Sequence, residues 1–164
     1  MPSPKTIKSI SIAAAPEDVY DFALGDLQSL PDWMSSVDQV TGADPNWPAI
    51  GSTHTYKRES GKQTLIGTTK VVEADRPRRV VFSETIVVEG DKRPPRGEGR
   101  SMWTFEPDGA GGTRITMELD GSDLGWPLYL IWKWLFRAQT HANVEKSLES
   151  LKRICEEELE DAAE

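Results

Sequence analysis

The sequence is poor in cysteine and histidine, and it has no long apolar run. Its single cysteine, Cys155, excludes an internal disulfide. With only two histidines in 164 residues, we expect no metal site built from clustered His and Cys ligands. No stretch reaches the roughly 20 apolar residues of a membrane-spanning helix. Residues 1–12 lack the apolar segment and cleavage site of a signal peptide. These absences predict a cytoplasmic protein without metal, cofactor or integral membrane association.

Positive charge is also scarce. The chain has 19 Lys and Arg against 27 Asp and Glu, which gives a net charge of −8. An acidic surface repels phosphate backbones, so we expect no nucleic-acid partner. With 37% hydrophobic and 28% charged residues, the composition is typical of a globular protein, and the length fits a single domain over residues 1–164.

The N-terminal part predicts one strand followed by two short helices. Lys5–Ile12 carries isoleucines among Lys, Ser and Thr, as a strand does. Pro16, followed by two acidic residues, is typical of the first turn of a helix, which should end near Gly25. A second short helix is expected over residues 26–30, and we expect Pro31 to break it.

The middle of the chain has the period-two pattern of strands separated by turn residues. Glycines in segments 60–62 and 108–112 are typical of hairpin turns. Short links without intervening helices predict an antiparallel meander. The expected strands cover residues 37–42, 52–59, 63–74, 79–89, 97–107 and 113–122.

A long C-terminal helix is predicted over residues 126–160, with Pro127 in its first turn. One stripe of this helix is apolar in its second half, where charged residues occupy the other side. The stripe consists of Leu130, Trp134, Arg137, His141, Val144, Leu148, Leu151 and Cys155.

Arg137 and His141 interrupt the stripe that should face the sheet. Burying an arginine in a filled apolar core is costly unless it is paired. Arg137 could therefore reach the rim, or pair with a strand carboxylate such as Glu84. Alternatively the core is hollow here and both side chains line a wet pocket, which is the interpretation we prefer.

Five segments, spread over nearly the whole chain, resemble the START-like superfamily, and within it the bacterial polyketide cyclase/dehydrase and lipid-transport family. They are residues 12–20, 30–34, 71–77, 103–107 together with 112–116, and 148–152. The resemblance implies an α+β helix-grip fold, in which a curved antiparallel sheet of about seven strands wraps around one long C-terminal helix, with two short helices after the first strand. Members of the superfamily include ligand carriers, aromatase/cyclases and ubiquinone-binding proteins, so the fold leaves the function open.

The sequence has no catalytic motif. It lacks a Gly-x-Ser-x-Gly elbow and a phosphate-binding loop, and Cys155 lies on the apolar stripe. Strand alternation instead predicts which side chains face inward, although both faces of segment 79–89 fit and we choose the face with Phe82 and Glu84. Each of the expected ligand-binding residues can equally be an ordinary core residue. They are Trp33, His54, Tyr56, Phe82, Glu84, Trp103, Phe105, Met117, Trp134, Arg137 and His141.

Three functions fit these expectations. The first is binding or transport of a hydrophobic small molecule, such as a lipid, polyketide or isoprenoid-like compound, in a pocket between sheet and helix. The second is a polyketide aromatase/cyclase-type enzyme that uses the same pocket, with His141 or Tyr56 transferring protons. The third is an interaction protein with a vestigial pocket. A homodimer could form through the Trp-rich start of the long helix, at Trp126, Trp132 and Trp134.

Overall fold

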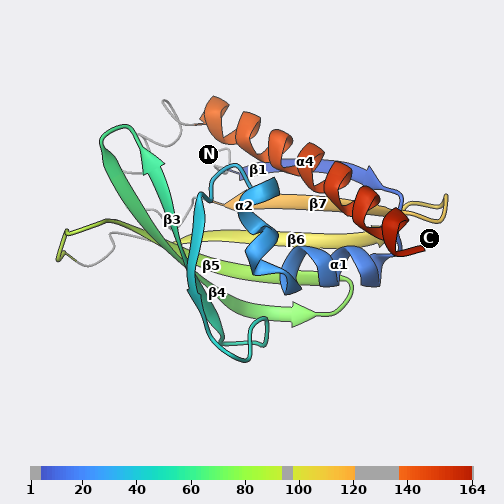
Figure 1. Ribbon diagram of the computed structural model, residues 1–164, viewed down its shortest axis with the longest axis horizontal. Helices are drawn as coiled ribbons and strands as arrows, with labels where there is room; N and C mark the ends of the chain where they lie inside the picture. The colour runs from blue at the N-terminus through green and yellow to red at the C-terminus, as the bar shows by residue number, and fades with distance from the viewer. Residues whose placement is uncertain (1–4, 94–97, 121–136, 164) are drawn as a thin grey trace.

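The computed structural model describes residues 5–93, 98–120 and 137–163 (Figure 1). The chain begins with strand β1, continues with the short helices α1, η1 and α2, and then forms six further strands before helix α4. The elements are β1 (Lys5–Ile12), α1 (Pro16–Gly25), η1 (Leu27–Ser29), α2 (Leu30–Trp33), β2 (Gln39–Ala43), β3 (Thr53–Ser60), β4 (Gln63–Asp75), β5 (Arg79–Val88), β6 (Gly99–Pro107), β7 (Thr113–Asp120) and α4 (Arg137–Ala163).

The seven strands form one antiparallel sheet in the order β1-β7-β6-β5-β4-β3-β2. This confirms the predicted meander, which β1 extends by pairing with β7, so that β1 and β2 are the edge strands. Helices α1, α2 and α4 lie on the same side of the sheet (Figure 1). Bulges in β2 and β4 bend these strands. Gly61 and Gly109 adopt positive φ angles in the hairpin turns predicted from the sequence.

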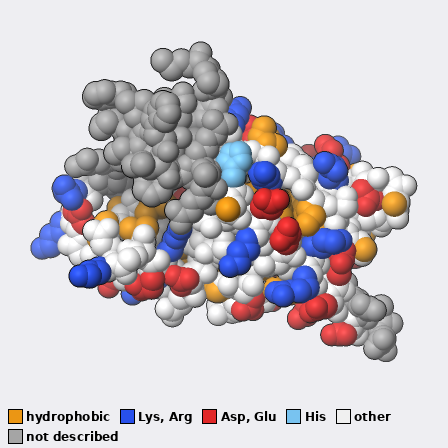
Figure 2. Space-filling view, turned by 90° about the horizontal axis from the view of Figure 1, so that it is seen from above, with side chains coloured by type: hydrophobic (Ala, Val, Ile, Leu, Met, Phe, Trp, Pro, Cys, Tyr) orange, Lys and Arg blue, Asp and Glu red, His pale blue; other side chains and the backbone are white. Residues whose placement is uncertain are grey.

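The core lies between the sheet and the helices. The apolar stripe of α4 is buried as predicted, with Val144, Leu148, Leu151 and Cys155 all below a tenth exposed. On the other side of α4 the side chains of Glu145, Lys146, Glu149 and Arg153 are exposed. Figure 2 shows charged side chains of both signs spread over the face seen from above. None of the helices in the described part of the chain is long and apolar enough to span a membrane.

The second helix differs from the prediction. We expected a helix over 26–30 that Pro31 breaks, but a 3₁₀ turn, η1, precedes α2, and Pro31 lies in the first turn of α2. The prediction was wrong because the first turn of a helix leaves its N–H groups unpaired, so proline fits there. The predicted start of the long helix lies outside the described residues, and α4 ends at Ala163 rather than at residue 160.

Candidate functional site

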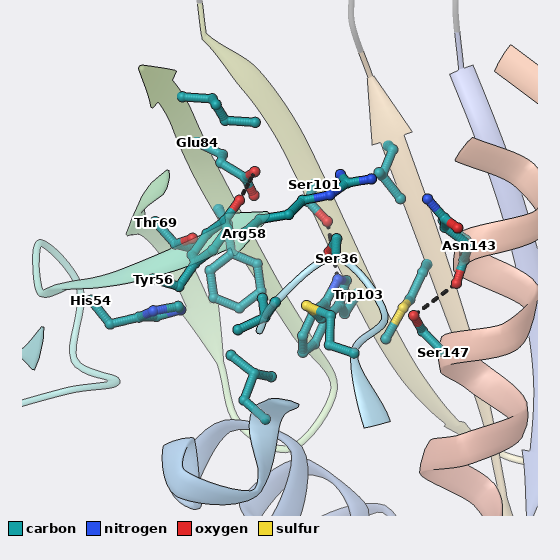
Figure 3. Close-up of a pocket in the computed structure, with 18 of the residues that line it drawn as sticks. Ser36, His54, Tyr56, Arg58, Thr69, Glu84, Ser101, Trp103, Asn143 and Ser147 are labelled. Carbon is teal, nitrogen blue, oxygen red and sulfur yellow. Dashed lines mark hydrogen bonds between the residues drawn. The ribbon is translucent and has the colours of Figure 1, made fainter. Parts of the chain in front are cut away.

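A cavity of about 690 Å³ lies between the sheet, the segment from α1 to residue 37, and α4 (Figure 3). Its volume falls within the range of about 300–1,000 Å³ that is common for small-molecule sites. The sheet and α4 therefore do not close fully upon each other. The cavity is lined by Ala23, Leu24, Leu27, Leu30, Met34, Ser36, Val37, Trp47, His54, Tyr56, Arg58, Ser60, Gln63, Leu65, Thr69, Phe82, Glu84, Ile86, Ser101, Trp103, Met117, Leu119, Thr140, Asn143, Val144 and Ser147.

Strand alternation brings six of the sequence-predicted residues to the cavity wall. They are His54, Tyr56, Phe82, Glu84, Trp103 and Met117. The inward face chosen for segment 79–89 is the one that lines the cavity, because Ile86 follows Phe82 and Glu84 along the wall. The period of two thus predicted which side chains of the sheet face the cavity.

Trp33 and Phe105 are buried in the core and are not among the lining residues. Trp33 packs edge-on against Trp103, with ring centroids 5.8 Å apart. Phe105 packs against Tyr20 with a centroid distance of 5.1 Å. Trp33 thus supports the wall residue Trp103 from behind, whereas Phe105 packs against α1 in the core.

Helix α4 presents Thr140, Asn143, Val144 and Ser147 to the cavity. His141 is half-buried and is not among the lining residues. Adjacent residues of a helix point about 100° apart, so the face that carries Thr140 leaves the next residue to one side. Trp134 and the side chain of Arg137 lie outside the described residues, so the expected pairing of Arg137 with Glu84 stays a prediction.

Aromatic rings form a continuous part of the wall. Trp47 packs edge-on against His54, with centroids 4.6 Å apart, and lies nearly parallel to Phe82 at 6.0 Å. Phe82 in turn packs edge-on against Trp103 at 4.9 Å. Trp47 comes from the loop before β3 and is fixed by its indole N–H, which donates to the backbone oxygen of Leu24 at 2.8 Å. Sequence analysis missed it because a loop has no alternation that reveals an inward face.

Tyr56 and Glu84 form a hydrogen-bonded pair on the cavity wall, in which the Tyr56 hydroxyl donates to Glu84 Oε1. Burial raises the pKa of the Glu84 carboxyl, and the bond from Tyr56 and the charge of Arg58 partly oppose that shift. Burial also raises the pKa of Tyr56, and the nearby Glu84 raises it further. Figure 3 shows the pair on the sheet side, opposite Asn143 and Ser147 of α4.

The ring of Tyr56 reaches this position because Gly67 stands directly opposite it on β4. A Cβ atom at position 67 would overlap with the Cζ, Cε1 and hydroxyl oxygen atoms of Tyr56. The absence of a side chain at Gly67 therefore leaves the space in which the ring lies against the sheet. No pattern in the sequence indicated this contact.

His54 is buried, with 5% of its surface exposed. Burial lowers its pKa from 6.5 to about 4, because the charged imidazolium is poorly solvated there. His54 is thus neutral at pH 7, with one nitrogen that donates and one that accepts hydrogen bonds. Its Nδ1 atom has no hydrogen-bond partner in the described part of the chain.

Polar contacts join α4 to the segment after α2. The Ser35 backbone N–H donates to Ser147 Oγ at 3.0 Å. The Ser147 hydroxyl donates to the backbone oxygen of Asn143 at 2.7 Å. These bonds hold the segment after α2 beside α4, where Ser36 and Val37 line the cavity.

The model of the family described as "Polyketide cyclase / dehydrase and lipid transport" matches residues 4–156. Among curated proteins, none matches the chain. Solved structures match closely in fold. Protein CV1439 from Chromobacterium violaceum has a TM-score of 0.67 at 13% identity, over 93% of this chain and 97% of that chain.

Two further structures give the same result. A protein from Arthrobacter aurescens, solved by NMR, has a TM-score of 0.71 at 12% identity, over 94% of this chain and 87% of that chain. Ara h 8.0201 has a TM-score of 0.65 at 11% identity, over 92% of this chain and 96% of that chain. Such low identities establish the fold alone, and the START-like fold expected from the sequence is confirmed.

The Gly67→Ala substitution tests the packing of Tyr56. We expect it to lower the free energy of unfolding by about 1–3 kcal/mol, because the new methyl group displaces the Tyr56 ring from Glu84. Urea denaturation measures the change. Gly42→Ala in β2 is the matched control, since its Cβ would be 3.4 Å from Thr55 Oγ1, an ordinary contact that is easily adjusted. Equal effects of the two substitutions would contradict the packing described for Tyr56.

The pH dependence of stability tests the burial of His54. Its pKa is about 4 in the folded protein and 6.5 when unfolded, so the unfolded chain binds the proton first as the pH falls. Wild-type stability should therefore decline between pH 6.5 and 4 relative to His54→Phe, by about 3 kcal/mol in total. Urea denaturation of both proteins across this range measures the difference. Parallel pH profiles would show that His54 is not desolvated.

Proposed function

Because the chain belongs to the polyketide cyclase / dehydrase and lipid transport family, we propose that it binds or transports a hydrophobic small molecule in the cavity between the sheet and α4. Lipid, polyketide and isoprenoid-like compounds are the classes that we expect. The observation that carries the proposal is the cavity of about 690 Å³, whose walls are mainly apolar and aromatic.

Apolar walls supply affinity in such a site. Each 100 Å² of apolar ligand surface removed from water contributes about 2.5 kcal/mol before the costs of association. A small number of polar groups then orient the ligand. Here the ionisable ones, His54, Tyr56, Arg58 and Glu84, lie on the sheet, while α4 contributes the neutral Thr140, Asn143 and Ser147.

The cavity wall reaches solvent at the free end of the β3–β4 hairpin. Ser60 and Gln63 line the cavity there and are exposed. Ile86 of β5 also lines it with 46% of its surface exposed. A ligand that enters between these residues meets the hairpin first and the aromatic wall afterwards.

Binding of 1-anilinonaphthalene-8-sulfonate, a dye whose fluorescence rises in apolar surroundings, tests the proposal. We expect saturable binding to the wild type at one dye per chain. Ile86→Trp should weaken it about tenfold, because the larger side chain occupies space at the cavity wall. Fluorescence titration at pH 7 measures the affinity.

Val87→Trp is the matched control for the dye titration. Val87 is the next residue of the same strand, is half-buried and points to the other side of the sheet. It should bind the dye as the wild type does. Absence of saturable binding, or equal weakening by the two tryptophans, would contradict a ligand site in the cavity.

The Tyr56–Glu84 pair favours a second candidate, an enzyme of the polyketide cyclase type that works in the same cavity. Burial raises the pKa of the Glu84 carboxyl, which is the direction that favours a role as general acid. Glu84 lines the cavity, so it could reach a bound carbonyl compound, whereas His141 is not among the lining residues.

Glu84→Gln separates carrier from enzyme. If the protein is a cyclase, the wild type converts a synthetic poly-β-keto thioester, and the variant loses about 10²–10⁴-fold in rate while it still binds the dye. Product analysis by liquid chromatography measures the conversion. The control is Glu89→Gln, since the side chain of Glu89 is 48% exposed and pairs with Lys57 on the surface. No conversion by the wild type would exclude this candidate and leave the carrier.

A further inference from the structure

His54 and Thr69 form a polar pair inside the largely apolar cavity. They are direct partners in the β3–β4 register, so their side chains project from the same face of the sheet. Both line the cavity, and they are 5% and 7% exposed. Figure 3 shows both residues on the sheet side of the cavity, beside Tyr56.

This pair has unused hydrogen-bonding capacity. His54 Nδ1 is closed to solvent and has no partner in the described part of the chain. Thr69 lines the cavity beside it, and its hydroxyl can both donate and accept. Two other polar pairs of the wall are already hydrogen-bonded: Tyr56 donates to Glu84, and the Trp103 indole N–H donates to Ser101 Oγ at 3.0 Å. A buried polar group without a partner costs about 1–3 kcal/mol, which a suitable ligand can recover.

The neutral imidazole of His54 determines which ligand group can form a hydrogen bond with it. With its pKa lowered to about 4, His54 presents one N–H and one lone pair at pH 7. The terminal torsion of a histidine is broadly two-fold, and a half-turn about the Cβ–Cγ bond would exchange the positions of Nδ1 and Cδ2. The Thr69 hydroxyl also donates and accepts. An uncharged oxygen, which a hydroxyl or carbonyl group offers, matches both side chains.

The surroundings favour an aromatic body for that ligand. Trp47 contacts His54 edge-on at 4.6 Å, and the Tyr56 ring lies 6.1 Å from His54. Aromatic rings prefer such offset and edge-to-face arrangements with other rings. A flat ring that carries an oxygen can therefore pack on this wall while its oxygen reaches the pair.

We propose that His54 and Thr69 form a hydrogen-bonding subsite for a hydroxyl or carbonyl oxygen carried by an aromatic ligand. The inference rests on the proposed function and specifies its ligand class as phenols or aryl ketones rather than plain hydrocarbons.

Two probes that differ in one group test the subsite. 2-Naphthol and 2-methylnaphthalene share their ring system, and only the former carries a hydroxyl group. Competition with 1-anilinonaphthalene-8-sulfonate gives the dissociation constant of each. The measured quantity is the ratio of the two constants in each variant relative to the wild type, which cancels the difference in hydrophobicity between the probes.

His54→Phe keeps an aromatic ring and removes both nitrogens, and we expect it to shift the ratio about fivefold against 2-naphthol. Thr69→Val, a nearly isosteric change, should shift it in the same direction, so the test does not depend on one variant that folds poorly. Thr68→Val is the matched control, because Thr68 is the adjacent residue on the other face of β4. It should leave the ratio unchanged.

The outcomes separate the subsite from the pocket. An unchanged ratio in both His54→Phe and Thr69→Val, with both probes bound, overturns the subsite and leaves the proposed function intact. A shift in Thr68→Val as large as in Thr69→Val also overturns it. If the wild type binds neither 2-naphthol nor 2-methylnaphthalene, the subsite and the proposed function are both overturned.

Discussion

The attachment of the C-terminal half of α4 to the first strand is the constraint on which the rest of the structure depends. Leu148, Leu151 and Cys155 are buried in the core. The Lys152 ammonium group donates to the backbone oxygen of Ser11 at 2.9 Å, and Glu156 Oε1 accepts from the backbone N–H of Ala13 at 2.9 Å. This end of the helix is thereby packed tightly, while Thr140, Asn143, Val144 and Ser147 face the cavity. One helix thus closes the core at one end and forms a cavity wall at the other.

The cavity combines apolar walls with polar groups whose hydrogen bonds are unevenly satisfied. Tyr56 and Glu84 are hydrogen-bonded to each other, and Ser147 accepts a hydrogen bond from the segment that follows α2. His54 Nδ1, by contrast, has no hydrogen-bond partner in the described residues, and Thr69 lines the cavity beside it. A filled core would have supported the interaction-protein hypothesis, and the observed volume instead supports a ligand site.

The sheet and its inward faces could be predicted from the sequence because a strand places alternate side chains on opposite faces. Phe82 and Glu84 were assigned to the cavity in this way. Pro31 was misplaced because proline both ends helices and opens them, and only the neighbouring backbone decides between these roles.

Other parts of the site depend on contacts between distant segments. Trp47 reaches the wall from a loop, and the space for Tyr56 comes from the glycine opposite it on the neighbouring strand. His141 lies on the same apolar stripe as Leu148. Three of the four residues of α4 that line the cavity, Thr140, Asn143 and Ser147, instead lie one position before residues of that stripe. Helical periodicity defines which residues share a face, but the docking angle decides which face meets a cavity.

NMR of the methionine methyl groups during titration with 1-anilinonaphthalene-8-sulfonate tests the central claim most directly. Met34 and Met117 line the cavity, whereas Met102 lies on the other face of β6 with its sulfur near Arg79 Nε, at 3.2 Å. The account predicts that the signals of Met34 and Met117 shift in proportion to bound dye and that the signal of Met102 does not. A shift confined to Met102, or dye binding that moves neither cavity methionine, would contradict it.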